Sequence, residues 1–69
     1  MPDTIYVARN EAILRNTGKN KIVLDVGCGS GFISKTLKDR NNITWGIDRS
    51  EDNLRIARNY LDKTIKLDI

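Results

Sequence analysis

Three glycines at alternate positions, Gly27, Gly29 and Gly31, follow a short apolar run in the stretch VLDVGCGSGFIS, residues 23–34. Glycine permits left-handed backbone and lets another group approach the chain without a Cβ in the way. The run before the loop is rich in β-branched residues, so residues Ile22 to Val26 are predicted to form a buried strand. A glycine loop between a strand and a helix constrains the fold far more than the glycines alone.

The rest of the chain alternates between helix and strand patterns. Helices are predicted from residue 30 to about 38 and from Ser50, a good N-cap, to about 61. Further strands are predicted from residue 43 to about 48 and at the terminal TIKLDI. Strands that alternate with helices form parallel sheets with right-handed crossovers. We therefore predict an α/β, Rossmann-like βαβαβ unit with three parallel strands in the order 3-2-1.

The segment before the first strand is predicted to be an added amphipathic helix over residues 4–16. Four apolar residues share one face at helical spacing: Ile5, Ala8, Ala12 and Ile13. Asp3 or Thr4 can cap its start, and Gly18 can end it. Residues 1–20 would then be an N-terminal helix and linker, and residues 21–69 the βαβαβ unit.

Length and composition restrict the class of protein. With 69 residues the chain forms at most one small domain, and 30% charged with 39% hydrophobic residues suits a globular chain. No apolar run approaches the roughly 20 residues of a membrane span, and the single Cys28 cannot form an internal disulfide, which indicates a reducing, cytoplasmic setting. The net charge of +3 is spread along the chain. We interpret it as a solvated surface, without excluding nucleic acid as a partner.

Two acidic residues end the second and third predicted strands. Asp48 lies 21 residues after Gly27, and Asp68 lies near the C-terminus. Ligands of such sheets bind outside the carboxyl ends of the strands, where an acid in the position of Asp48 accepts hydrogen bonds from ribose hydroxyls. The alternatives are that Asp48 caps the next helix or pairs with Arg49, and that the glycines serve only tight packing.

The spacing of the loop helps to choose the ligand. A dinucleotide fingerprint reads G-x-G-x-x-G, but Phe32 stands where its third glycine would be. Asp25, just ahead of the loop, would repel a pyrophosphate and attract a cation. A nucleoside that carries an amino group and a sulfonium therefore fits better than one that carries phosphates.

The stretch VLDVGCGSGFIS resembles motif I of the class I S-adenosylmethionine-dependent methyltransferases, which reads D/E-x-G-x-G-x-G. WGIDRSEDNLRIAR and KLDI are similar to the segments that follow in that family, so the resemblance covers roughly residues 22–69. It implies a cofactor-binding half that holds S-adenosylmethionine. The implied binding residues are Asp25, Gly27, Cys28, Gly29 and Gly31 for the methionine end and the loop, Asp48 for the ribose, and Arg49, Asp68 and the backbone of Ile69 for the adenine.

Other residues that invite a functional role have simpler interpretations. Cys28 lacks any histidine to activate it, so we interpret it as a small loop residue and not a nucleophile. Trp45 is predicted to lie in the core. Tyr6 is interpreted as a half-buried tyrosine of the N-terminal helix, although some members of the family use such a residue to reach the cofactor. No catalytic or metal-ligating residue is predicted.

A complete domain of this family is longer and has more strands, so the chain is expected to be a truncated domain. The complete protein is expected to bind S-adenosylmethionine and transfer its methyl group to an acceptor that the sequence leaves open: small molecule, protein or RNA. The alternatives are a non-catalytic binding or assembly module and an NAD or nucleotide-binding half domain. Without a fourth strand, Ile22 to Val26 would be an exposed edge, which predicts a homodimer or a partner chain there.

Overall fold

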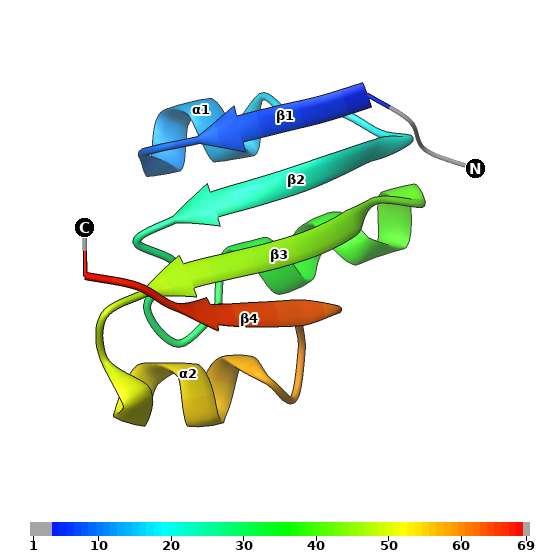
Figure 1. Cartoon of the computed structure of the whole chain (residues 1–69). Helices are drawn as coiled ribbons and strands as arrows, with labels where there is room; N and C mark the ends of the chain where they lie inside the picture. Colours follow the sequence, from blue (N-terminus) through cyan, green and yellow to red (C-terminus); the bar gives the residue numbers. More distant parts are fainter. Residues whose placement is uncertain (1–3, 69) are drawn as a thin grey trace.

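The computed structural model describes residues 4–68, and for residues 38–40 the backbone alone (Figure 1). Its elements in chain order are β1 (Thr4–Ala8), α1 (Glu11–Arg15), β2 (Lys21–Val26), the 3₁₀-helix η1 (Ser34–Arg40), β3 (Ile43–Asp48), α2 (Glu51–Ala57) and β4 (Lys63–Lys66). The four strands form one parallel sheet in the order β1-β2-β3-β4. The α/β class is therefore confirmed, whereas the prediction of three strands in the order 3-2-1 is wrong by one strand.

The additional strand is β1, in the segment predicted as a helix. The sequence TIYVA contains three β-branched residues and an aromatic residue, which favours a strand. Its burial follows a period of two, because Ala8 is buried while Val7 is exposed. The segment was predicted as a helix because Ile5 and Ala8 are three residues apart, a spacing that also occurs on one face of a helix. The helix is shorter and begins later, where the side chain of Asn10 accepts from the amide of Ile13 at 2.9 Å.

The predicted exposed edge of Ile22 to Val26 is also wrong. β1 pairs with β2 along its length, from Thr4 opposite Lys21 to Ala8 opposite Asp25. An apolar strand that is hydrogen-bonded on both sides has no free backbone groups to recruit another chain. Self-association stays a prediction, but β2 does not offer the edge for it.

The remaining elements follow the sequence pattern more closely. The strands predicted at residues 22–26 and 43–48 are confirmed, and Ser50 caps α2 by accepting from the amide of Asn53 at 3.3 Å. α2 ends at Ala57 and not near residue 61, and a turn leads into β4. The helix after the glycine loop begins at Ser34, because left-handed backbone at Gly31 (φ +81°) delays it.

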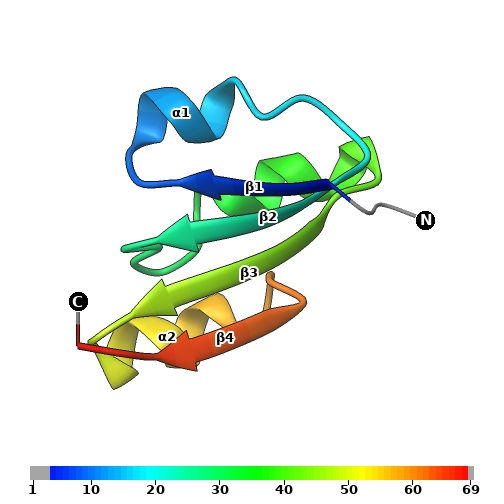
Figure 2. The same cartoon turned by 45° about the horizontal axis from the view of Figure 1, so that its top comes forward.

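The helices lie on one face of the sheet: α1 and η1 are behind the strands in Figure 1, and α2, drawn below β4 there, lies behind β4 in Figure 2. This arrangement follows from right-handed crossovers that always step to the next strand in the same direction. The core lies between the helices and the face of the sheet that the helices cover. Its buried apolar residues include Ala8, Leu14, Val23, Leu37, Leu54, Ala57 and Leu61. Within the described residues, no helix is long and apolar enough to cross a membrane.

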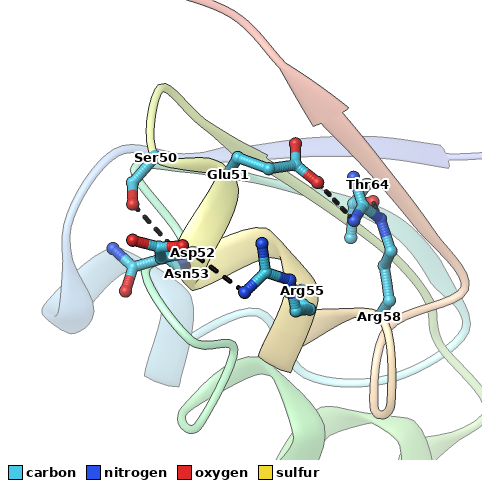
Figure 3. Close-up of polar contacts among 7 residues, drawn as sticks. All are labelled: Ser50, Glu51, Asp52, Asn53, Arg55, Arg58 and Thr64. Carbon is cyan, nitrogen blue, oxygen red and sulfur yellow. Dashed lines mark hydrogen bonds and ion pairs between the residues drawn. The ribbon is translucent and has the colours of Figure 1, made fainter.

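Ion pairs and hydrogen bonds fasten α2 to its surroundings (Figure 3). Arg58 donates to Glu51 at 2.6 Å and to the hydroxyl of Thr64 in β4 at 3.1 Å, so it ties the helix to the sheet. Arg55 lies 3.5 Å from Asp52. Arg55 and Arg58 are thus paired with acidic residues on α2, which supports the interpretation of the basic residues in this region as part of a solvated surface.

Candidate functional site

The glycine loop lies at the carboxyl edge of the sheet and is hydrogen-bonded to the neighbouring strand. The amides of Gly27 and Cys28 both donate to the carbonyl of Ile47, at 2.7 and 3.0 Å. The sharp turn requires left-handed backbone at Gly27 (φ +77°) and Gly29 (φ +57°). Glycine adopts this conformation readily because it has no Cβ. The loop is thereby held in one conformation across the ends of β2 and β3.

The glycines have different roles in the structure. A Cβ placed on Gly27 or Gly29 would meet no atom within 4 Å, so the loop is open on that side. A Cβ on Gly31 would lie 3.2 Å from the Cβ of Ala57 in α2. Gly31 therefore allows the loop to pack against a helix, while Gly27 and Gly29 leave room for a ligand.

Asp48 connects the loop to the start of α2. Its Oδ2 accepts from the amide of Gly29 and its Oδ1 from the amide of Ser50, both at 2.9 Å. These backbone donors, that of Ser50 first, hold the pKa of the Asp48 carboxyl below its usual value. The N-cap of α2 is Ser50, and Asp48 holds the amide of this cap residue, so Asp48 supports the start of the next helix without being its cap. Since each carboxylate oxygen has a second lone pair, Asp48 can still accept from ligand hydroxyls.

Asp25 is the buried acid of the site, with 7% of its surface exposed. Its Oδ2 accepts from the hydroxyl of Ser34, the first residue of η1. Burial raises the pKa of the Asp25 carboxyl, and the charge of Asp48 adds to the rise, while the Ser34 hydroxyl opposes it. A cation placed beside this carboxylate would stabilise its ionised form. Ser34 was missed in the sequence, where a serine after an apolar pair gave no sign of facing an acid.

Cys28 packs back onto the sheet. A Cβ at Gly46 of β3 would lie 2.7 Å from its Sγ and 2.5 Å from Leu61, so the absence of a side chain at Gly46 makes space for the thiol. Burial, together with the charges of Asp25 and Asp48, raises the pKa of the Cys28 thiol to about 11. The thiol therefore stays protonated at neutral pH, which supports its interpretation as a small loop residue. The sequence did not reveal the supporting role of Gly46.

Two clefts lie at the carboxyl ends of the strands. The larger, of about 650 Å³, is lined by the residues after β3 and at the end of β4: Arg49, Ser50, Lys66, Leu67 and Asp68. The smaller, of about 220 Å³, includes Asp25, Gly27 and Cys28. Arg9 and Asn10 of the turn between β1 and α1, and Glu11 at the start of α1, also line it, and these residues were not predicted to lie near the site.

The structure thus brings most of the predicted binding residues to one edge of the sheet. Asp25 and the loop face one cleft, Arg49 and Asp68 face the other, and Asp48 lies between them through its bond to Gly29. Ile69 lies outside the described residues. The chemistry of this edge suits an elongated nucleoside with hydroxyls in its middle and a cationic group at one end.

Two aromatic residues considered in the sequence lie elsewhere. Tyr6 is half-buried, as expected, but in a strand and not a helix, and its hydroxyl donates to the carbonyl of Ile13 at 3.3 Å. Trp45 is half-buried and not a core residue, with the Lys63 ammonium 4.8 Å from its ring centre.

Comparison with known proteins places this site in a family. Residues 17–66 match the family described as a methyltransferase domain. The chain is 43% identical over 47 residues to the ubiquinone biosynthesis O-methyltransferase of Coxiella burnetii (strain RSA 493 / Nine Mile phase I), covering 68% of this chain and 20% of that protein. The protein of the same name from Hydrogenovibrio crunogenus is 50% identical over 40 residues, 58% of this chain and 17% of its own.

A relative with a different named activity also matches. A probable cobalt-precorrin-6B C(15)-methyltransferase (decarboxylating) from Methanococcus maripaludis is 40% identical over 48 residues, 70% of this chain and 26% of that protein. The chain spans about a fifth of the length of the first of these relatives. No solved structure gives a significant match. With its family match over residues 17–66 and its glycine loop at the carboxyl edge of a parallel sheet, the chain belongs to the class I S-adenosylmethionine-dependent methyltransferase family.

Proposed function

We propose that this chain binds S-adenosylmethionine across the carboxyl edge of its sheet, as the donor half of a methyltransferase. The observation that carries the proposal is the hydrogen bond from Gly29 to Asp48, which holds an open-sided glycine loop between two clefts. A ligand that spans both clefts must pass over this bond. The nucleoside and the amino-acid end of S-adenosylmethionine meet this requirement.

The ribose is proposed to lie over Asp48. Both of its oxygens already accept one backbone amide each, so the carboxylate is held in place before a ligand arrives. The remaining lone pairs accept from two vicinal hydroxyls. Preorganisation of this kind lowers the entropy cost of binding.

The adenine is proposed to lie in the larger cleft, between Arg49 and Leu67. Arg49 stands where many family members have an aliphatic residue, and its guanidinium plane or its aliphatic stem can stack on a purine. Asp68 lines the same cleft and supplies an acceptor for an exocyclic amino group.

The methionine end is proposed to lie in the smaller cleft. Asp25 faces the cationic amino group, and Arg9 of the turn after β1 offers an opposite charge for the carboxylate. The same buried acid disfavours a pyrophosphate, because an anion beside a poorly solvated carboxylate is repelled. This argument favours S-adenosylmethionine over NAD.

The reaction of the complete protein is proposed to be displacement at the activated methyl group by a nucleophilic acceptor. When bound, the cofactor supplies a methyl group on a positively charged sulfur. The residues of this chain contribute binding and orientation, which is a large part of such catalysis. The relatives are named for chemically different acceptors, so the acceptor is left open here, and a binding module without turnover is the second outcome to be tested.

Calorimetric titration of the chain with S-adenosylhomocysteine, with NAD as the control ligand, tests the proposal. We expect binding of the first and none of the second, and a loss of binding in Asp48→Ala. Asp52→Ala is the matched control, because Asp52 is an exposed acid in the first turn of α2. Selective binding of NAD would overturn the proposal. Tight binding without methyl transfer to any component of a cell extract would favour the binding module.

A further inference from the structure

A buried hydroxyl and a buried carboxylate meet beside the smaller cleft. Ser34 is fully buried, Asp25 is 7% exposed, and the hydroxyl of Ser34 donates to Oδ2 of Asp25. The two residues lie nine positions apart, at the start of η1 and near the end of β2, and both fall within the matched segment 17–66. Since a buried polar group costs free energy unless it is hydrogen-bonded, each group stabilises the other in the folded chain.

The glycine loop places Ser34 over the end of β2. The amide of Gly31 donates to the carbonyl of Cys28 at 3.1 Å, and the amide of Lys35 donates to the carbonyl of Gly31 at 3.0 Å. These two bonds turn the chain from the loop into η1, so the position of the Ser34 hydroxyl is fixed by the same loop that borders the cleft. The orientation of Asp25 is thereby coupled to the conformation of the loop.

The two oxygens of Asp25 have different surroundings. Oδ2 accepts from Ser34, whereas no residue in the described part of the chain donates a hydrogen bond to Oδ1. Among the side chains that the structure describes, the hydroxyl of Thr17 is the polar group that is fully buried without a partner, so Oδ1 stays open to the cleft that Asp25 lines. Oδ1 is therefore the oxygen that a ligand can reach.

We propose that Ser34 is a positioning residue for the ammonium group of the bound ligand: by holding Oδ2 of Asp25, it keeps Oδ1 directed toward the smaller cleft. This inference rests on the proposed function, in which that cleft takes the amino-acid end of S-adenosylmethionine. Without the hydroxyl, the carboxylate can rotate, because the terminal torsion of an aspartate has broad minima. Ser34 does not line the cleft, so it acts through Asp25.

The same hydrogen bond favours the charged form of Asp25. Burial raises the pKa of the Asp25 carboxyl, and the Ser34 hydroxyl opposes this rise because it donates to the ionised form. The other charged groups around the carboxyl are Asp48, which raises this pKa further, and Arg9 and Glu11, which line the same cleft. Removal of the hydroxyl should thus leave the carboxylate less well oriented and more easily protonated, and both changes weaken the attraction for an ammonium group.

Calorimetric titration of the full 69-residue chain with two ligands tests this role. S-adenosylhomocysteine carries the amino-acid end, and 5′-methylthioadenosine has the same nucleoside and a thioether without that end. In Ser34→Ala, the dissociation constant for S-adenosylhomocysteine should rise about tenfold, while that for methylthioadenosine should change by less than about twofold, because the lost hydrogen bond serves the ammonium site alone. Ser34→Thr keeps a hydroxyl and should restore the affinity for S-adenosylhomocysteine.

Thr36→Ala is the matched control, because it removes another hydroxyl of η1. The Thr36 hydroxyl donates to the carbonyl of Ile33 at 2.7 Å on an exposed residue that does not line the cleft. This variant should leave both affinities unchanged, and circular dichroism shows whether each variant is folded. In the background of Asp25→Asn, Ser34→Ala should not weaken the binding of S-adenosylhomocysteine further, because the charge through which Ser34 acts is already absent.

The pH profile of binding separates positioning from a purely structural role. From about pH 4 to 7 the amino group of the ligand stays protonated, so a loss of affinity on acidification reports protonation of a carboxylate. Because the Ser34 hydroxyl holds the pKa of Asp25 down, this loss should begin at a higher pH in Ser34→Ala than in the wild type.

The outcomes distinguish this inference from the proposed function. A wild type that binds neither ligand would overturn the proposed function, and the role of Ser34 with it. If the wild type binds S-adenosylhomocysteine, two results would overturn the role of Ser34 alone. One is an affinity and pH profile of Ser34→Ala equal to those of the wild type, and the other is an equal loss of affinity for both ligands.

Discussion

The amide of Gly29 donates to Oδ2 of Asp48 at 2.9 Å, and this bond joins the glycine loop to the end of β3. The two residues lie 19 positions apart in the sequence. The other oxygen of the same carboxylate accepts from Ser50 at the start of α2. One side chain therefore fixes the loop, the strand end and the helix start, and the proposed ribose site is formed before any ligand binds.

Replacing Asp48 should therefore weaken both binding and folding. In Asp48→Ala two backbone amides lose their acceptor, and we expect a loss of about 1–2 kcal/mol in the free energy of unfolding. We also expect the dissociation constant for S-adenosylhomocysteine to rise about 100-fold or more, because the hydroxyl contacts are charge-assisted. Calorimetry and urea denaturation measure the two effects.

Asp48→Asn separates these contributions. It keeps one acceptor oxygen but places an NH₂ group against a backbone amide, so it should weaken binding while costing less stability than alanine. Equal affinity for the ligand in Asp48→Asn and wild type would contradict the proposed ribose contact.

Asp25→Asn should affect binding and folding in opposite directions. The asparagine oxygen can still accept from Ser34, while the cost of burying a charge disappears. We expect an equal or higher free energy of unfolding at pH 7 and about 10- to 100-fold weaker binding of S-adenosylhomocysteine, since the ammonium loses its counterion. Denaturation and calorimetry on the same protein sample measure both.

The pH dependence of stability gives Asp25 a signature of its own. Because its pKa is raised in the folded state, the folded chain holds this proton longer than the unfolded chain. Its contribution to the free energy of unfolding should therefore decline as pH rises from 3.8 through the raised pKa, and Asp25→Asn should abolish that decline. A variant that lost stability at neutral pH and bound the ligand normally would contradict both expectations.

Gly46→Ala should destabilise the fold through a steric conflict with Leu61 and Cys28. The new methyl group would lie 2.5 Å from Leu61 Cδ1 and 2.7 Å from Cys28 Sγ, so these groups must shift. We expect a cost of about 1–3 kcal/mol in urea denaturation. In the double variant Gly46→Ala/Leu61→Ala, the new methyl group fills part of the space that Leu61 vacates. The double variant should therefore lose less free energy of unfolding than the sum of the losses in the two single variants. Strict additivity would show that the conflict is relieved elsewhere.

The sequence predicted β2, β3 and the cap of α2 because each is a local pattern: a β-branched run, or a serine followed by acids. It also placed Asp25, the glycine loop and Asp48 at one edge, since parallel strands end together. It failed at β1, where TIYVA suits both a strand and a helix face. Pairing with β2, a contact between segments distant in the sequence, decides that choice.

The parts of the site that could not be predicted depend on the same kind of distant contact. Ser34 faces Asp25, and Gly46 makes space for Cys28, only because the sheet and η1 are folded against each other. Arg9 reaches the smaller cleft because β1 is a strand that ends at the same edge as β2. A single sequence contains the residue types for these contacts but not the register that brings them together.

The thiol of Cys28 should be slow to react in the folded chain. Its pKa is raised from 9.0 to about 11, so at pH 8 the folded chain holds about 100-fold less thiolate than the unfolded chain. Alkylation by iodoacetamide, followed by mass spectrometry from pH 7 to 11, should be slower than in denaturant by about this factor below pH 9, and the difference should shrink to about twofold at pH 11. Between pH 9 and 11 the unfolded thiol ionises while the folded thiol does not, so the free energy of unfolding should decline over this range. Cys28→Ala should remove that part of the decline in the free energy of unfolding. A midpoint at or below pH 9 in the pH profile of alkylation of the folded chain would show that the thiol is neither buried nor influenced by Asp25 and Asp48.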